Sequence, residues 1–375
     1  MTGNTFGRIF RVTTSGESYG EALLTIVDGV PPGLELTNEI IQEELDKRKP
    51  GQSKLDSPRK ETDIVTLVSG MRDGFTTGAP VGMIVYNVDR HDIHVQQYRD
   101  VKEQIRPGHA EYTFFTKYGK YADWCGAGRA SGRESVGRVA GGAVAKQILL
   151  KEGIESIGYV SESHGIKMNP MSFEDIKKNY RKNILNCPDL EKAEEMIDDI
   201  VKVKDTGDTA GGIVEVIVRG VPAGLGEPVF DKLRATIAYG IMGIGAVTGV
   251  EFGAGFDAAR VTGYEWNDEP CMKDGKVRFR TNRAGGFLGG ISNGEDLVIR
   301  MAVKPTPTLS IAQKSIDMDK MEEKELEAIT RRDPSICPRI YPVAEAMVNM
   351  AVVDALMVAR GYDNVCRIEN PWRQI

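Results

Sequence analysis

The chain has 375 residues, 41% of them apolar, so it can bury a sizeable core as one large domain or two ordinary ones. A formal net charge of −6 argues against general binding to nucleic acid or to acidic membranes, which requires a basic surface. Five widely spaced cysteines without a CxxC pair predict neither a disulfide framework nor a zinc site. With no apolar leader and no run of about 18 apolar residues, we expect a cytoplasmic protein without a membrane span.

The first ninety residues are predicted to be mostly β-structure with one helix. Strands are expected at 9–12, 22–27, 64–69 and 81–87, and a helix capped by Thr37 at 38–49. Gly16-Glu-Ser-Tyr-Gly20 has the letters of a hydrolase nucleophile elbow, but a strand rather than a helix is expected after it, which disfavours a serine hydrolase. The polar segment 52–60 is predicted to be a loop that closes over a ligand.

The segment 104–146 combines a glycine-rich turn, a predicted helix start and several cationic side chains. Ser131 and Glu134 have the spacing of a capping box, and the apolar period after them predicts a helix to about residue 152. The amino end of a helix carries partial positive charge and free amides, which favour an anion such as phosphate. The alternative is an ordinary capped helix with solvated arginines. The segment contains one histidine, His109, and four arginines, Arg106, Arg129, Arg133 and Arg138.

The second half is predicted to continue as mixed α and β. Strands are expected at 154–160, 212–219, 247–252, 258–261 and 297–303, and helices at 172–179, 189–204, 231–241 and 343–360. The charged stretch around 165–205 is predicted to be a peripheral insertion. A second glycine-rich run, 284–294, precedes a strand that ends at Lys304-Pro-Thr-Pro-Thr308, a pattern suited to a phosphate or the edge of a flavin.

Three common motif interpretations are disfavoured. Gly126–Gly132 is one residue too long for GxGxxG and follows a poor parallel strand, so a dinucleotide-binding Rossmann site is not expected. The chain has no GxxxxGK[ST] motif. It has only four histidines, and no carboxylate at ligand spacing around His109, so we expect no metal site.

Ten collinear motifs between residue 4 and about residue 360 resemble those of the chorismate synthase family. The motifs are Asn4-Thr-Phe-Gly7, Gly16-Glu-Ser-Tyr-Gly20, Asp28-Gly-Val-Pro-Pro-Gly33, Arg48-Lys-Pro-Gly51, Arg106-Pro-Gly-His-Ala-Glu-Tyr112, Gly128-Arg-Ala-Ser-Gly-Arg-Glu134, Gly226-Glu-Pro-Val-Phe230, Ala284-Gly-Gly286, Lys304-Pro-Thr306 and Arg332-Asp-Pro334. The resemblance covers almost the whole chain, which predicts a single domain over 1–375.

The resemblance implies a fold and an activity. The expected fold is α+β, a β-α-β sandwich with helices between two antiparallel four-stranded sheets. The expected reaction is the anti 1,4-elimination of phosphate from 5-enolpyruvylshikimate 3-phosphate to give chorismate, in the shikimate pathway of aromatic amino-acid biosynthesis. The resemblance also implies reduced FMN (FMNH2) without net redox change, a homotetramer, and NADPH or a separate flavin reductase as the source of the reduced flavin.

The same resemblance implies roles for individual residues. His109 would stabilise the flavin anion, and an ordinary pKa near 6.5 would allow this; Ser18 and Asp333 would relay the proton from the flavin, and Tyr19 occupies a catalytic position. The implied substrate contacts are Arg48, Arg106, Arg129, Arg133 and Arg331. The implied FMN contacts are Arg129, Ala130, Ser131, Gly245, Ala246, Gly289, Lys304, Pro305, Thr306, Pro307, Thr308 and Arg331. The implied NADP contacts are Arg48 and Lys54.

The sequence departs from the family pattern at positions 19, 54, 307 and 332. Tyr19 stands where GESHG has a histidine, and a phenol with a pKa near 10 cannot arrive as a cation. Arg332 occupies the histidine position of RHDP, Lys54 a usual arginine, and Pro307 a usual serine. We expect Arg332 to restore some of the missing positive charge. The alternative is a homologue that binds flavin or a phospho-ligand but has impaired catalysis because of Tyr19.

Overall fold

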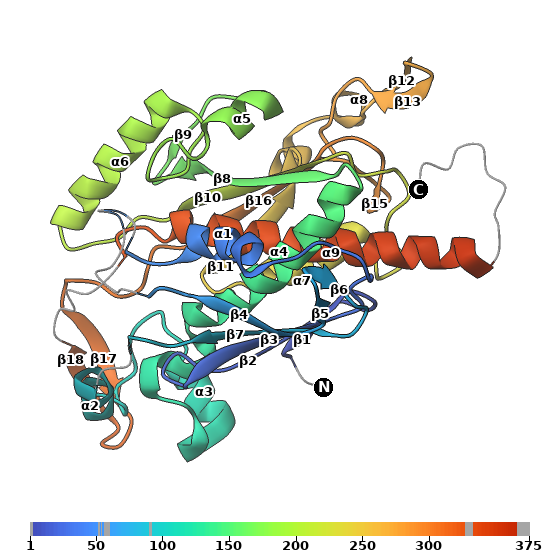
Figure 1. Ribbon diagram of the computed structural model, residues 1–375. Coiled ribbons are helices and arrows are strands. Elements are labelled where there is room, and N and C mark those ends of the chain that lie inside the picture. The colour runs from blue at the N-terminus through green and yellow to red at the C-terminus, as the bar shows by residue number, and fades with distance from the viewer. Residues whose placement is uncertain are drawn as a thin grey trace.

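Two antiparallel sheets form the outer layers of the molecule, and long helices lie between them (Figure 1). The computed structural model describes residues 3–51, 53, 55, 61–89, 92–326 and 333–365. The first sheet has the order β1 (Thr5–Phe6), β2 (Arg11–Ser15), β3 (Ala22–Asp28), β7 (Val81–Tyr86) and β4 (Val65–Ser69). The second has the order β11 (Val247–Phe252), β16 (Leu297–Val303), β10 (Gly212–Arg219), β8 (Glu155–Ser163) and β9 (Ile166–Lys167).

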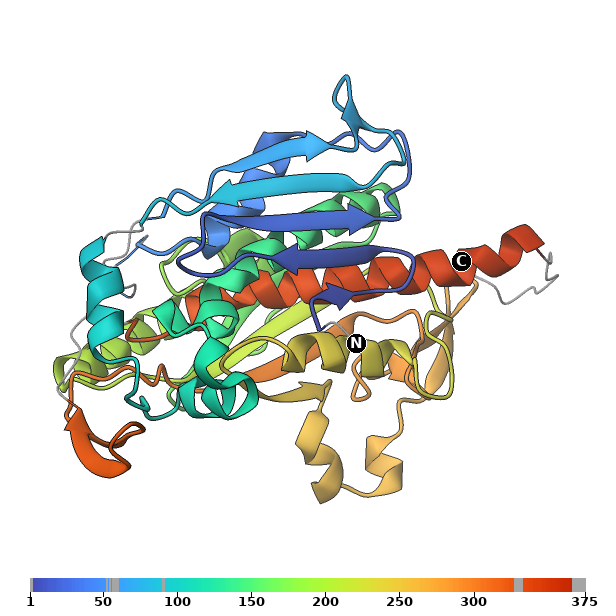
Figure 2. The same cartoon turned by 90° about the horizontal axis from the view of Figure 1, so that it is seen from below.

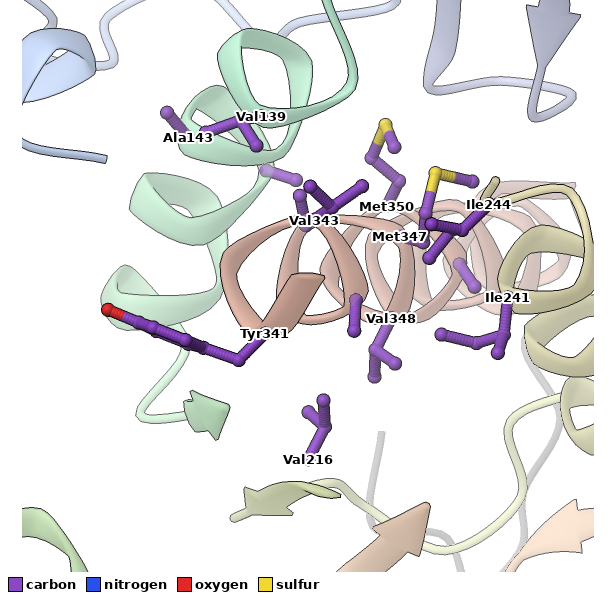
Figure 3. Close-up of a cluster of buried hydrophobic side chains, with 14 of the residues drawn as sticks. Val139, Ala143, Val216, Ile241, Ile244, Tyr341, Val343, Met347, Val348 and Met350 are labelled. Atoms are coloured by element: carbon purple, nitrogen blue, oxygen red, sulfur yellow. The ribbon is translucent and has the colours of Figure 1, made fainter. Parts of the chain in front are cut away.

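The inner layer contains the helices α1 (Asn38–Arg48), α4 (Ser135–Lys151), α7 (Leu233–Met242) and α9 (Cys337–Val365). Strand residues alternate between buried and exposed, as along β16, because only one face of each sheet packs on these helices. Helix α4 packs closely on α9: a Cβ atom at Gly142 would lie 2.2 Å from the Cβ of Ala346. Figure 3 shows apolar side chains of α4, α7, α9 and β10 meeting in this core.

The remaining elements lie around these three layers. Helices α5 (Phe173–Asn179) and α6 (Leu190–Asp205) lie on the outer side of the second sheet (Figure 1), and the β17–β18 hairpin (Gln313–Asp317 and Glu322–Leu326) projects at one end (Figure 2). That 165–205 is an insertion into a single domain stays a prediction. The other short elements are α2 (Asp92–Asp100), α3 (Glu111–Tyr118), α8 (Gly263–Trp266), η1 (Gly119–Tyr121), η2 (Cys125–Ala130), η3 (Gly132–Glu134), η4 (Gly255–Arg260), β5 (Met71–Arg72), β6 (Phe75–Thr76), β12 (Pro270–Lys273), β13 (Lys276–Phe279), β14 (Phe287–Leu288) and β15 (Ile291–Ser292).

Most of the predicted elements are present, and several details are corrected. Each sheet has five strands where four were expected; in each, the additional strand is a two-residue strand at one edge, too short to give a sequence pattern. The segment 258–261, predicted as a strand, belongs largely to η4. The helix predicted at 343–360 begins at Cys337 and continues through Pro342. Helices α2 and α3 were not predicted.

Helix α9 also corrects the expectation that the chain lacks a long apolar run. Over Cys337–Gly361 it is long and apolar enough to cross a membrane by length and composition alone, but 83% of the qualifying window is buried inside the protein. Its apolar surface therefore faces α4, α7 and the second sheet, as expected of a core helix.

Candidate functional site

A cavity of about 290 Å³ lies where the carboxyl end of α1, the η2–η3 turn before α4 and the beginning of α9 meet. Its lining is polar and largely cationic, because four arginines face only two carboxylates among the described lining residues. The lining residues are Tyr19, Arg48, Pro50, Glu61, Tyr98, Arg106, His109, Gly126, Ala127, Ala130, Ser131, Gly132, Arg133, Thr306, Thr308, Asp333, Ile336 and Arg339.

Two of the arginines share one buried carboxylate. Arg48 donates from Nη2 to Asp63 Oδ2 at 2.5 Å, and Arg133 donates from Nη1 to Asp63 Oδ1. The exposed fraction is 1% for Arg48, 4% for Arg133 and 0% for Asp63. Burial lowers the pKa of Arg48 to about 10 even though Asp63 raises it, so the guanidinium remains charged at pH 7. One negative charge thus orients two positive charges at the wall of the cavity.

These two guanidiniums are not fully hydrogen-bonded by the protein. Among the described residues, the buried Nε of Arg48 and Nη2 of Arg133 have no hydrogen-bond partner, and neither does Oγ1 of Thr306. Arg133 Nη2 forms a longer ion pair with Glu61, at 3.5 Å. Unsatisfied buried donors are rare in folded proteins and cost free energy, so these atoms indicate a place for a polar, anionic ligand or for water.

His109 connects the cavity to the carboxyl end of β16. Its Nε2 lies 3.0 Å from Thr308 Oγ1, and Lys304 Nζ donates to the carbonyl of the neighbouring Gly108 at 2.9 Å. Burial, followed by the charges of Arg106 and Lys304, lowers the pKa of His109 to about 3. The expectation of an ordinary pKa is therefore wrong for this environment: the imidazole is neutral at pH 7.

Two tyrosines and Arg106 form another part of the wall. The ring of Tyr19 meets the ring of Tyr98 edge to face at 5.4 Å, and the Arg106 guanidinium lies 5.8 Å from the centroid of Tyr98. Arg106 Nε donates to Glu111 Oε1 at 2.7 Å. The phenol at position 19 therefore lies at the cavity, next to an aromatic ring that also contacts a cation.

The glycine-rich turn before α4 contributes backbone to the cavity. Gly126, Ala127 and Gly128 have φ values of 61°, 64° and 47°, the left-handed region that favours glycine. A Cβ atom at Gly126 would lie 2.6 Å from the Tyr19 ring, so only glycine allows this approach. Ser131 accepts a hydrogen bond from the Arg133 amide at 3.2 Å and caps η3. The predicted capping box is incomplete, because the Glu134 carboxylate accepts from Arg138 Nε instead.

Asp333 and Arg339, which also line the cavity, form an ion pair. Arg339 Nη1 donates to Asp333 Oδ2 at 2.9 Å, and Arg339 Nε donates to the backbone carbonyl of Arg48 at 3.4 Å. Ser18 is buried, with its hydroxyl 3.2 Å from where a Cβ of Gly126 would be, but it does not line the cavity.

The structure brings together about half of the residues assigned from the resemblance. The predicted residues that line the cavity are Tyr19, Arg48, Arg106, His109, Ala130, Ser131, Arg133, Thr306, Thr308 and Asp333. Pro307 and Thr308 also line a small adjoining hollow. Arg331, Lys54, Arg332 and most of the predicted loop 52–60 lie outside the described residues.

Arg129 is placed differently from the other predicted arginines. It donates to the Gly16 carbonyl at 3.0 Å, to Thr14 Oγ1 at 2.8 Å and to Asn4 Oδ1 at 3.0 Å. It lines a second cavity, of about 210 Å³, between the amino-terminal strands and α4, α7 and α9. Its side chain is held by Thr14 of strand β2, by Gly16 directly after that strand and by Asn4 before β1, and it does not line the first cavity.

Five of the predicted flavin contacts also lie away from the cavity lining: Gly245, Ala246, Gly289, Lys304 and Pro305. Gly245 and Ala246 precede β11, and the Ala246 carbonyl accepts from the Lys304 amide at 2.9 Å, which connects them to the strand end that carries Thr306. Gly289 is in the β14–β15 turn, and Pro305 is not among the lining residues.

Several residues of the site were not predicted: Glu61, Asp63, Asn87, Tyr98 and Arg339. For Arg339 the sequence held a signal, because a cation in the first turn of a helix opposes the helix dipole and indicates another use. Asp63 and Asn87 lie in loops without a motif, and only tertiary structure shows their contacts. No group of three metal-ligating side chains that could hold an ion occurs within the described ranges.

Comparisons with known proteins agree on one family. The family model described as chorismate synthase matches residues 10–357. The chorismate synthase of Acetivibrio thermocellus is 59% identical over 380 aligned residues, covering 96% of both chains. That of Methanosarcina barkeri is 48% identical over 357 residues, covering 95% of this chain and 97% of the relative. A crystal structure of chorismate synthase superposes with a TM-score of 0.74 at 30% identity, covering 95% of this chain and 93% of the other.

Proposed function

The chain belongs to the chorismate synthase family of enzymes, and we propose that it converts 5-enolpyruvylshikimate 3-phosphate to chorismate and phosphate by an anti 1,4-elimination that depends on reduced FMN. The family predicted from ten short motifs is confirmed by the match over residues 10–357. The alternative of an impaired binding homologue gains no support from the comparisons, since the relatives described above all carry the name of the enzyme.

The observation that carries the proposal is the cationic cavity. The proposed substrate has a phosphate ester and two carboxylates, and bidentate guanidinium groups suit both kinds of anion. Arg48, Arg106 and Arg133 line the cavity, and two of their buried nitrogens, Arg48 Nε and Arg133 Nη2, have no hydrogen-bond partner among the described residues. Positive charge beside the ester also favours the reaction itself, because negative charge builds on the phosphate as it leaves.

The residues present also fit a reduced flavin. Thr306 presents a buried hydroxyl without a described partner, and Thr308, Ala130 and Ser131 line the same cavity beside His109. When bound, the reduced flavin would supply an electron-rich ring that assists the loss of phosphate. The amide and hydroxyl groups of these residues would hold its polar edge, in the same arrangement that places His109 against Thr308.

His109 and Asp333 are proposed to handle protons. His109 is neutral because burial and two nearby cations lower its pKa to about 3. An anion in the cavity would offset the charge of Arg106 and raise the pKa of His109 towards its ordinary value, which would let it hold a proton at a ring nitrogen. The Asp333 carboxylate, oriented by Arg339 at 2.9 Å, is the proposed acceptor in the proton relay, with Ser18 buried nearby beside Gly126.

The proposed assembly is a homotetramer in the cytoplasm. Leu24, Ile26 and Tyr86, which lie on the face of the first sheet that points away from the helices, are 42%, 50% and 60% exposed. Contiguous exposed apolar side chains of this kind mark association surfaces. Light scattering after gel filtration should give four copies per particle, and Ile26→Glu should reduce that number.

The source of the reduced flavin is proposed to be NADPH or a separate flavin reductase. Of the two proposed NADP contacts, Arg48 is buried at the cavity and Lys54 lies outside the described residues. Product formation with NADPH and FMN alone, without another protein, would show that the chain reduces its own flavin. Product formation only with a chemical reductant would show that it needs an external one.

An anaerobic assay tests the main proposal. Purified protein is mixed with the substrate and chemically reduced FMN, and chorismate and phosphate are measured together, with oxidised FMN as the control. Equal amounts of both products, formed only with reduced FMN, are expected. Tight binding of reduced FMN without release of either product would contradict the proposal and would favour the binding homologue.

A further inference from the structure

The side chain of Asn87 links the arginine cluster to the loop that carries Ser18 and Tyr19. Asn87 follows the last residue of β7 and is 8% exposed. Its Oδ1 accepts from Arg133 Nε at 2.8 Å. Its Nδ2 donates to the carbonyl of Glu17 at 3.0 Å and to that of Gly20 at 2.8 Å. The side-chain amide of Asn87 therefore bonds to Arg133 through its oxygen and to the loop of Ser18 and Tyr19 through its nitrogen.

The two carbonyl groups that receive these bonds bracket the dipeptide Ser18-Tyr19. The backbone N–H of Gly20 also donates to the Glu17 carbonyl at 3.1 Å, so this carbonyl both closes the turn over residues 17–20 and accepts from Asn87. The backbone N–H of Asn87 donates to the backbone carbonyl of Glu21 at 3.0 Å, next to the pairing of Ala22 with Tyr86 at the ends of β3 and β7. The turn is thereby attached to the end of the sheet, and the position of Tyr19 follows from it.

The other contact fixes the plane of Arg133. Asp63 and the more distant Glu61, at 3.5 Å, contact the terminal nitrogens of Arg133, whereas Asn87 adds a hydrogen bond at Nε, on another edge of the guanidinium. This orientation leaves Nη2 of Arg133 without a described hydrogen-bond partner at the cavity wall. Catalytic groups require placement within a fraction of an ångström, and residues behind them usually supply it.

We infer that Asn87 is a positioning residue that fixes Tyr19 and Arg133 relative to each other at the cavity, so that the phenol and the guanidinium act on one ligand together. It does not line the cavity and touches no ligand itself. This inference rests on the proposed function, because Tyr19 and Arg133 matter only if the cavity binds the phosphate ester.

The test compares Asn87→Ala with a matched control, Thr76→Val. Thr76 is also buried and also holds a loop, since its hydroxyl donates to the Pro31 carbonyl at 2.6 Å and accepts from the Leu34 amide at 2.9 Å, but it is not at the cavity. We expect kcat/KM of Asn87→Ala to fall about ten- to a hundredfold, and that of Thr76→Val to stay within about twofold. Equal, small effects of the two changes would overturn the inference.

A double-mutant cycle distinguishes positioning from general destabilisation. If Asn87 positions Tyr19 through the loop, Tyr19→Ala removes that part of its contribution and leaves only the part that acts through Arg133, so Asn87→Ala should cost less in the Tyr19→Ala background than in the wild type. Independent, multiplicative losses would overturn the inference. Should Asn87→Ala fail to fold, Asn87→Asp replaces it: it keeps the shape and an acceptor for Arg133 but loses both donations to the loop.

A readout besides turnover comes from calorimetry with 5-enolpyruvylshikimate 3-phosphate in the absence of flavin. Asn87→Ala is expected to weaken binding because Arg133 loses its hydrogen bond at Nε, while Thr76→Val leaves it unchanged. Unchanged affinity together with unchanged kcat/KM in Asn87→Ala would reject the inference. A wild-type protein that forms no chorismate would instead reject the proposed function, so the two failures are distinguishable.

Discussion

Replacing Asp63 by asparagine tests whether one carboxylate holds the cavity together. Asp63 is 0% exposed and accepts from both Arg48 and Arg133. Asparagine preserves its shape and tolerates its left-handed φ of 50°, so the change removes charge without adding backbone strain. Removing one partner of a buried ion pair costs about 3–5 kcal/mol. Because two guanidiniums lose their counter-charge here, we expect the free energy of unfolding to fall by at least about 3 kcal/mol.

The matched control is Asp28→Asn, which removes the carboxylate of an exposed pair with Arg11 at 2.8 Å. Exposed pairs contribute about 0–1 kcal/mol, so urea denaturation should show little change for this variant. Similar losses for the two variants would refute the reasoning. Inorganic phosphate should recover part of the loss in Asp63→Asn, since an anion that binds the folded cavity stabilises it by mass action.

The pH dependence of this difference has a definite sign. Burial by itself raises the pKa of Asp63, but Arg48 and Arg133 outweigh it, and the pKa is lowered from its ordinary 3.8. A group with a lowered pKa in the folded state stabilises the fold above the pKa of the unfolded state, and this contribution is lost as the pH falls through the folded value. The difference between the wild type and Asp63→Asn should therefore be constant above about pH 5 and shrink only at lower pH.

Three further predictions concern single side chains. Tyr19→His should raise turnover about ten- to a hundredfold in the anaerobic assay, because a charge-assisted contact with the leaving phosphate contributes about 1.5–3 kcal/mol; an unchanged or lower rate would count against the role of Tyr19. Burial and nearby cations lower the pKa of His109 to about 3, so as the pH falls below about 6.5 the histidine takes up a proton in the unfolded state but not in the folded state. Between pH 7.5 and 5.5 this should lower the free energy of unfolding of the wild type by up to about 1.4 kcal/mol more than that of His109→Gln, as measured by urea denaturation. Asp354→Asn should lower the free energy of unfolding by about 2–3 kcal/mol in urea, because its carboxylate accepts from the successive amides of Arg8, Ile9 and Phe10 at 2.7–3.0 Å; a loss below about 0.5 kcal/mol would be the contrary result.

Local sequence patterns predicted the secondary structure where one face of an element is buried. The apolar run at 22–27 before a turn and the cap at Thr37 predicted β3 and α1 nearly to the residue. Patterns failed where packing is weak or the element is short. Helix α2 has few apolar residues, and η4 is a six-residue element whose last residues, with Val261 after them, were predicted as a strand. A two-residue edge strand such as β9 leaves no period to detect.

For the site, sequence reasoning identified charges but not their partners. The predicted helix start gave Arg129 and Arg133 the same role in binding an anion, because both flank the same capped turn. In the structure Arg133 turns inward to Asp63 and lines the cavity, whereas Arg129 turns to the Thr14 hydroxyl and the Gly16 carbonyl of the neighbouring strand and loop. Two positions four residues apart thus receive different roles from contacts that are distant in sequence.

The buried arginine cluster has a consequence for how ligand binding and stability are connected. Asp63 accepts hydrogen bonds from both Arg48 and Arg133, and Glu61 forms a longer ion pair with Arg133 at 3.5 Å. Each arginine keeps a buried nitrogen without a hydrogen-bond partner among the described residues. Such an arrangement is costly in the folded protein alone, since a buried charge without full pairing is unfavourable. An anionic ligand would supply negative charge and the missing acceptors, so it should stabilise this region more than a neutral ligand of the same size. Binding of the proposed ester would therefore offset the cost of these incompletely hydrogen-bonded guanidiniums, and selectivity for phosphate and carboxylate groups would follow from the same contacts that hold α1 against the start of α4.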